Sequence, residues 1–288
     1  MNRRSFALFI MPSVSIMTFL MVIPLVTTIW LSFTGLLLRD LNSAPFVGLQ
    51  NYREVFADPN FWRATRFTVV FVVITVPIEI MLGMTFALLL DRVQRFRSIY
   101  LAAILLPFIV TPVVGTLLFR NLFSRGGLLS WLIELVSGES FVIDASNVRF
   151  LILLHAIWQV TPFAFVAIFA GLQLLPQERV DAAAMDGARF WSSFVYVTLP
   201  HLKSVLFFVA IISIMDSYRV FDSVFVFAGS RFDDSHTLSV YNSVEALDAK
   251  IGRLGKGHAI AVLTIVGIFV VLIPFLVRSY KEQIAERT

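Results

Sequence analysis

The chain of 288 residues contains no cysteine, which excludes a disulfide framework, a thiolate nucleophile and any cysteine-based metal site. Charge is also scarce: charged residues make up 15%, against about 25% in soluble domains. With 58% hydrophobic residues and a mean hydropathy of +0.85, the composition is typical of a membrane protein. The net charge of +4 requires no nucleic-acid partner, because basic loops at an anionic membrane surface account for it.

Motifs for catalysis and cofactor binding are missing as well. The Gly255-Lys256 pair has neither the earlier glycine nor the following Ser or Thr of a phosphate-binding P-loop. No His-Glu-x-x-His occurs, and Gly138-Glu-Ser140 lacks the strand–turn–helix setting of a hydrolase nucleophile. We therefore predict a protein that is not an enzyme, with no cofactor, no metal and no ATP site of its own.

Long apolar segments dominate the chain. Segments that long are predicted to cross a membrane as helices, since lipid satisfies no backbone hydrogen bonds. The first segment is too long for a cleaved signal peptide, so we expect it to be retained. The sequence thus predicts an all-α fold in one transmembrane domain, residues 1–288, whose internal prolines kink the helices without breaking them. The expected spans are 6–33, 65–90, 99–119, 150–175, 203–227 and 258–279.

Loop charges give a weak indication of orientation. The two sets of loops carry ten Lys and Arg residues each, but the set containing both termini is shorter in total. Its compact loop 91–97 holds three arginines, and short loops are where the positive-inside rule applies. We expect a multi-pass protein of the cytoplasmic membrane with both termini in the cytoplasm. The outer loops 34–64 and 120–149 are predicted to contain short helices near 49–56 and 128–136; docking surfaces and simple lids remain equal alternatives.

Residues 176–200 form the longest polar interruption that still has a helical pattern. Pro176 suits the first turn of a helix, and three alanines follow at 182–184. Gly187 suits the left-handed residue that ends a helix, and Asp186 is expected to cap the next one. That second helix carries an apolar stripe at 190, 191, 194 and 195. We predict a helical elbow in water that leads into a span.

This elbow resembles the cytoplasmic coupling loop, or EAA loop, of permease subunits of binding-protein-dependent ABC importers. The match consists of Asp181-Ala-Ala183, then Gly187, and finally Leu199-Pro200. Asp181 replaces the usual Glu, which keeps the charge and shortens the reach. The resemblance implies that an ATPase subunit contacts the elbow at Asp181, Ala182, Ala183, Met185, Asp186, Gly187 and Phe190.

The fifth predicted span holds a cluster of charge at Asp216, Arg219 and Asp222, next to Tyr218. Steps of three residues place the charges in one slanting row on a helix. The row either lines a translocation pathway or forms an internal salt-bridge ladder. We expect packing for Asp216 and cavity contact for Tyr218. The stretch 216–222 also resembles the sugar-permease pattern Asp-Ala-Phe-Lys/Arg-Val-Phe-Asp, although the Gly-Gly-Pro that follows in the family is absent.

Three further polar or aromatic residues in the spans are candidates for the solute pathway. Glu79 is isolated in the second span and is protonated, paired across helices or directed into a cavity. Trp158 and Gln159 form a combination common in sugar sites, although a Trp near the end of a span more often packs or anchors at the interface. Their neighbour His155 is more consistent with packing than with a ligand.

Over nearly its full length the chain resembles the sugar-type permease subunits of type I ABC importers. The resemblance implies half of a translocation pathway that works by alternating access. The implied partners are a homologous second permease, two ATP-binding subunits, an extracytoplasmic solute-binding protein, membrane lipid and a small polar solute of the carbohydrate class, with no nucleic acid. The alternatives are a secondary transporter, disfavoured by the small number of spans and the lack of an internal repeat, and an intramembrane hydrolase.

Overall fold

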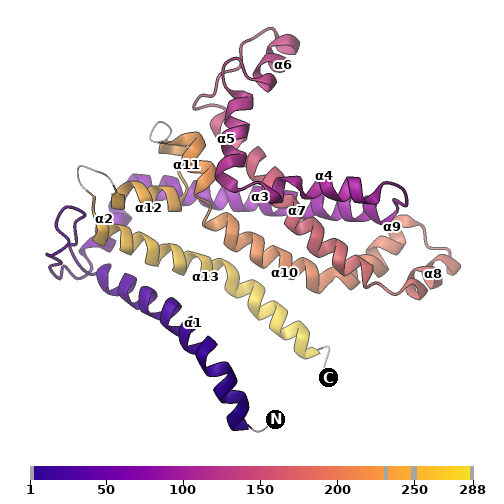
Figure 1. Ribbon diagram of the computed structural model, residues 1–288, viewed down its shortest axis with the longest axis horizontal. Coiled ribbons are helices and arrows are strands. Elements are labelled where there is room, and N and C mark those ends of the chain that lie inside the picture. The colour runs from indigo at the N-terminus through magenta and orange to yellow at the C-terminus, as the bar shows by residue number, and fades with distance from the viewer. Residues whose placement is uncertain (1–2, 230–232, 248–251, 286–288) are drawn as a thin grey trace. The chain divides into compact units, whose positions relative to one another are not determined.

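The computed structural model describes residues 3–229, 233–247 and 252–285, and these are helical apart from loops (Figure 1). Their only β-type pairing consists of the isolated bridges Thr34–Phe46 and Leu37–Asp40, so the all-α prediction is confirmed. The α-helices are α1 (Arg3–Leu31), α2 (Gln50–Ala57), α3 (Pro59–Asp91), α4 (Arg97–Ile109), α5 (Pro112–Phe123), α6 (Leu128–Ser137), α7 (Val148–Gln173), α8 (Gln177–Met185), α9 (Phe190–Ser193), α10 (Leu199–Tyr218), α11 (Asp222–Ala228), α12 (Leu238–Leu247) and α13 (Leu254–Ala285). A π-helix spans Phe194–Thr198 and a 3₁₀-helix spans Asp233–Ser235.

Within the described residues, five helical segments are long and apolar enough to cross a membrane, and a bent pair brings the number to six. The bent pair occupies the expected third span, where α4 and the segment Pro112–Ser137 meet at 99°. The prediction that the prolines only kink their helices is wrong here. The chain is extended at Val110 and Thr111, and Pro112 opens α5, where its missing N–H leaves no bond unmade.

The chain divides into two compact units, which we describe separately. Unit 1 contains α1, α2, α12 and the beginning of α13. The buried side chain of Asn51, on α2, donates hydrogen bonds to the carbonyl oxygens of Ser32 and Thr34 at 2.9 and 2.8 Å. These bonds fasten α2 to the loop that follows α1. The short helices predicted in the outer loops are confirmed as α2 and α6.

An ion-pair cluster joins α2, α12 and α13 within unit 1. The Lys256 ammonium is 6% exposed and lies 3.0 Å from the Asp58 carboxylate and 2.9 Å from that of Glu245. The Tyr241 hydroxyl donates to Asp58 at 2.7 Å, and a second ion pair joins Arg253 to Glu54. Because a buried ammonium is costly without partners, this cluster fixes the three elements to one another.

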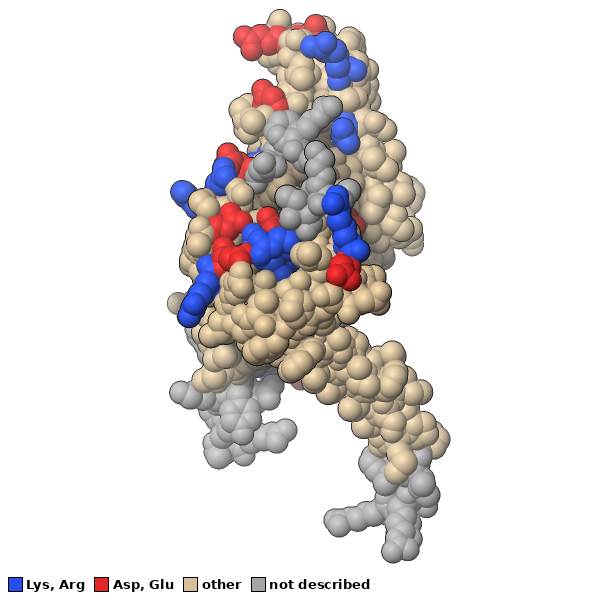
Figure 2. Space-filling view, turned by 90° about the vertical axis from the view of Figure 1, so that its left-hand side faces the viewer, with Lys and Arg blue, Asp and Glu red and all other residues tan. Residues whose placement is uncertain are grey.

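These contacts also shift the proton affinity of Asp58. Partial burial would raise the pKa of this carboxyl group, but hydrogen bonds from Tyr241, the Asn60 amide and Lys256 outweigh burial and hold the pKa below its usual value. The Asp58 carboxylate therefore stays ionised in the folded unit. In the space-filling view, acidic and basic side chains lie intermixed on the face turned to the viewer, beside a broad surface without charged side chains (Figure 2).

Unit 2 is built on α3, α7 and α10, which share one apolar core. Gly83 allows α3 to approach α7 closely, because a Cβ there would lie 2.8 Å from the backbone nitrogen of Phe165. The C-terminal ends of α3 and α7 lie next to α8, since residues of all three helices line one pocket. The buried residues of the core are Met84, Ala87, Leu90, Ala164, Phe165, Ile168, Leu172, Leu202 and Val209.

The expected fifth span is interrupted near its end. Helix α10 ends at Tyr218, Arg219 follows as its C-cap, and α11 begins at Asp222. The Thr237 hydroxyl donates to the carbonyl oxygen of Val220 at 2.8 Å, which satisfies a backbone group freed by the break. The expectation of a single helical row through residues 216, 219 and 222 is therefore wrong.

Candidate functional site

The first element of the predicted elbow is α8, and this helix ends in a complete Schellman turn. The Gly187 amide donates to Ala184 at 3.0 Å, and the Ala188 amide donates to Ala183 at 2.9 Å. Gly187 has a φ of +78°, a left-handed conformation that side chains disfavour. The short helix and sharp turn predicted from the sequence are confirmed.

The second helix of the elbow begins differently from the expectation. Asp186 is the C-cap of α8, whereas Arg189 is the N-cap of α9, so the prediction that Asp186 caps the second helix is wrong. The turn places Gly187 and Ala188 between the C-cap of the first helix and the N-cap of the second. Asp186 therefore lies three residues before the N-cap position and cannot cap α9. From α9 the chain continues through the π-helix into α10 without a loop, so the elbow is joined to a span.

Helix α8 has no buried residue. The Met185 side chain is 89% exposed, and Asp181 accepts a hydrogen bond from Gln177 at 3.1 Å that leaves its carboxylate on the surface. The structure therefore gathers all the predicted coupling residues on one exposed elbow. Six of them are exposed and Ala183 is partly covered: Asp181, Ala182, Ala183, Met185, Asp186, Gly187 and Phe190.

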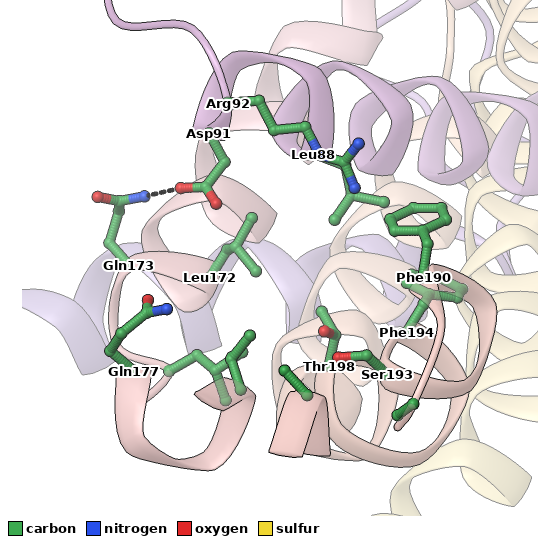
Figure 3. A pocket seen from close by; sticks show the side chains of 14 residues that line it. Leu88, Asp91, Arg92, Leu172, Gln173, Gln177, Phe190, Ser193, Phe194 and Thr198 are labelled. Carbon is green, nitrogen blue, oxygen red and sulfur yellow. Dashed lines mark hydrogen bonds between the residues drawn. The ribbon is translucent and has the colours of Figure 1, made fainter. Parts of the chain in front are cut away.

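One contact joins the elbow to the end of α3, and a second contact joins the ends of α3 and α7. The Gln173 side-chain amide donates to the Asp91 carboxylate at 2.7 Å, and the Arg92 guanidinium lies over the Phe190 ring at 4.5 Å from its centroid (Figure 3). A pocket of about 480 Å³ lies between these helices and the elbow. The elbow is thus exposed on its outer surface and contacts the end of α3 through Arg92, while the Gln173–Asp91 bond holds the end of α7 against α3.

A second cavity of about 720 Å³ lies within unit 2, between α3, α7, the break between α4 and α5 and the break between α10 and α11. It brings together five of the seven predicted pathway residues, namely Glu79, Gln159, Asp216, Arg219 and Asp222. Trp158 and Tyr218 are not among its lining residues. Trp158 instead packs on Phe119 with ring centroids 4.9 Å apart, and Tyr218 is 5% exposed.

The charged pair in this cavity is open to its surroundings. Arg219 and Asp216 form an ion pair at 2.8 Å with side chains that are 70% and 50% exposed. The expectations are therefore reversed, because Asp216 lines the cavity while Tyr218 packs. Among the described residues, Asp222 forms no ion pair with Arg219, since the helix break separates them.

Ser213, which the sequence analysis did not select, supports the wall of the cavity through Glu79, and Gln159 stabilises the break between α4 and α5. Ser213 donates a hydrogen bond to Glu79, and Gln159 donates to the carbonyl oxygens of Pro107 and Val110 at 2.6 and 2.9 Å. Gln159 thereby satisfies backbone groups at the break before α5. Ser213 lies about one turn before Asp216 on α10, and this spacing could have indicated that it faces the same side of the helix.

Comparisons with known proteins agree with this geometry. No protein-family profile matches the chain. It is similar to the trehalose/maltose transport system permease protein MalF of Thermococcus litoralis, with 32% identity over 95% of this chain and 92% of that protein. It is also similar to the arabinooligosaccharides transport system permease protein AraP of Halalkalibacterium halodurans, with 34% identity over 90% of this chain and 83% of that protein. A bacterial ABC transporter that imports the acidic polysaccharide alginate shares the fold, with a TM-score of 0.83 and 17% identity over 97% of this chain and 96% of that chain.

Proposed function

The chain belongs to the family of permease subunits of carbohydrate ABC importers, and from that premise we propose that its elbow docks on a cytoplasmic ATPase subunit while its cavity forms part of the solute pathway. The observation that carries the proposal is the elbow itself, which is exposed on one surface and braced on the other. Both termini then lie in the cytoplasm, on the same side as the elbow.

Energy for transport comes from outside this chain. The sequence lacks a P-loop, so ATP is bound and hydrolysed by two partner subunits. Closure of the ATPases moves the elbow, the Arg92–Phe190 contact passes the movement to the end of α3, and the Asp91–Gln173 bond couples α3 to α7. Since both helices also line the 720 Å³ cavity, the movement alters access to the solute.

The cargo that we propose is a carbohydrate, delivered by an extracytoplasmic binding protein to a pathway shared with a second permease. The names of the relatives support this class, because they refer to trehalose, maltose and arabino-oligosaccharides. The lining supports it as well: carboxylate, guanidinium and amide groups form hydrogen bonds to sugar hydroxyls, and those to charged groups are the stronger ones.

Site-directed cross-linking tests the docking proposal. The chain has no cysteine, so Met185→Cys introduces a single thiol on the elbow. A short thiol-to-amine cross-linker should join this variant to the ATPase subunit in the assembled complex. Val136→Cys is the matched control, because Val136 is 88% exposed at the end of α6, outside the elbow. Equal cross-linking of both variants, or none at Met185→Cys in an intact complex, would contradict the docking assignment.

A further inference from the structure

Three buried polar atoms in the walls of the 720 Å³ cavity have no hydrogen-bond partner among the described residues. They are Oε2 of Glu79, Nδ1 of His155 and Oε1 of Gln159, and all three residues line the cavity. Glu79 and His155 are 0% and 1% exposed. Buried polar groups are normally paired, so three unpaired atoms around one cavity indicate a role beyond packing.

Two of these three atoms, on Gln159 and His155, are placed to accept a hydrogen bond. Gln159 uses its NH₂ group for the carbonyl oxygens of Pro107 and Val110, which identifies the unpaired Oε1 as the amide oxygen. The Thr116 hydroxyl donates to Pro112 at 2.7 Å, so it can only accept from Nε2 of His155, 3.4 Å away. The proton of the neutral imidazole is therefore assigned to Nε2, and Nδ1 carries a free lone pair.

Glu79 adds a carboxyl group to this set. Ser213 donates to one of its oxygens, and the other receives no hydrogen bond from the part of the chain that the structure describes. The cavity also contains Asp216 and Asp222, against the single guanidinium of Arg219, which already pairs with Asp216. The lining thus has an excess of hydrogen-bond acceptors and of acidic side chains.

We propose that this cavity recognises its cargo through hydrogen-bond donors on the cargo, and that the cargo is a neutral or amino-bearing sugar rather than a uronate. The inference rests on the proposed function and specifies its substrate class. The three acceptors are covered in this conformation, so the cargo reaches them when the walls part during transport. Sugar hydroxyls and ammonium groups supply the missing donors, whereas a carboxylate supplies none and is repelled by the acids.

Saturation-transfer NMR on the assembled complex in nanodiscs tests the proposal without the binding protein. The probes are maltose, the amino sugar chitosan disaccharide and digalacturonate, which are neutral, cationic and anionic. We expect the first two to bind and digalacturonate to bind about tenfold more weakly, equivalent to about 1.4 kcal/mol. Equal or tighter binding of digalacturonate, or binding of none of the three, would overturn the proposal.

The Glu79→Gln variant tests whether Glu79 contributes to the preference for maltose over digalacturonate. It keeps the size of the side chain while removing the charge and adding a donor. It should weaken maltose binding and strengthen digalacturonate binding, so that the preference narrows. Glu134→Gln, on α6 outside the cavity, removes the same charge and should leave the preference unchanged. Equal preferences in Glu79→Gln and wild type would also refute the assignment. Cross-linking at the elbow is independent of these binding measurements, so failure of the two proposals can be distinguished.

Discussion

Gly187 offers the sharpest test of the link between local backbone structure and coupling. Its φ is +78°, and a Cβ at this position would meet nothing within 4 Å. The cost of Gly187→Val is therefore conformational and not steric. A left-handed residue costs about 1–2 kcal/mol when it carries a side chain, and β-branched residues are the least tolerant. That cost opens the turn that ends α8.

Helix α8 has little to offset such a cost. It has nine residues and none is buried, and helices this short are marginal without tertiary packing. A penalty of about 1–2 kcal/mol reduces the population with an intact elbow by a factor of roughly 5–30. We expect the affinity for the ATPase subunit to fall by the same factor, because only the intact elbow fits its partner.

The assay is titration of purified ATPase subunit onto the permease pair in nanodiscs, with Gly138→Val as a matched control. Gly138 has a φ of +75° at the end of α6 and equally open space, so it carries the same backbone cost outside the elbow. Gly187→Asn should have an intermediate effect, since asparagine tolerates the left-handed conformation. The reasoning is refuted if Gly187→Val and Gly138→Val bind the ATPase equally well.

Four further predictions concern the energy source, stability, its pH dependence and the cavity. Uptake into vesicles should stop when ATP is removed and persist when an ionophore collapses the proton gradient; loss of uptake with the ionophore would favour a secondary transporter. Lys256→Met leaves Asp58 and Glu245 without their partner and should cost about 3 kcal/mol of stability, measured by thermal unfolding. Because the folded pKa of Asp58 is lowered, its stabilising contribution should be complete at pH 7 and lost as the pH falls below 3.8 and through the folded pKa, a loss visible as a lower melting temperature. Arg219→Met removes an exposed pair worth about 0–1 kcal/mol, so transport should fall while the melting temperature changes little; a large loss of stability would restore the packing interpretation of Asp216.

Local chemistry was sufficient to predict the elbow. The turn depends on Gly187 and on the alanines before it, and its hydrogen bonds join residues at most five positions apart. The same holds for α2 and α6, where apolar spacing indicated a short helix. In each case the determining interactions lie within the segment, so a single sequence contains the information.

Positions that depend on contacts across the fold were predicted less well. Tyr218 and Asp216 are two residues apart, yet the first packs and the second lines the cavity. Helical periodicity cannot separate these roles when the helix itself ends at Tyr218. Trp158 was likewise linked to its neighbour Gln159, although its ring packs on Phe119, which is 39 positions earlier in the chain.

The two helix breaks explain why the errors concentrate around the cavity. A run of apolar residues predicts an uninterrupted span, because a broken helix in lipid leaves backbone groups unpaired. Here side chains from elsewhere in unit 2 supply the missing partners: Gln159 donates to Val110 at the first break, and Thr237 donates to Val220 at the second. Neither partner is recognisable from the segment that it completes. Residues of both breaks line the same cavity. Irregular backbone is thus tolerated where it lines a binding site, and the helical preference of the sequence is overridden there.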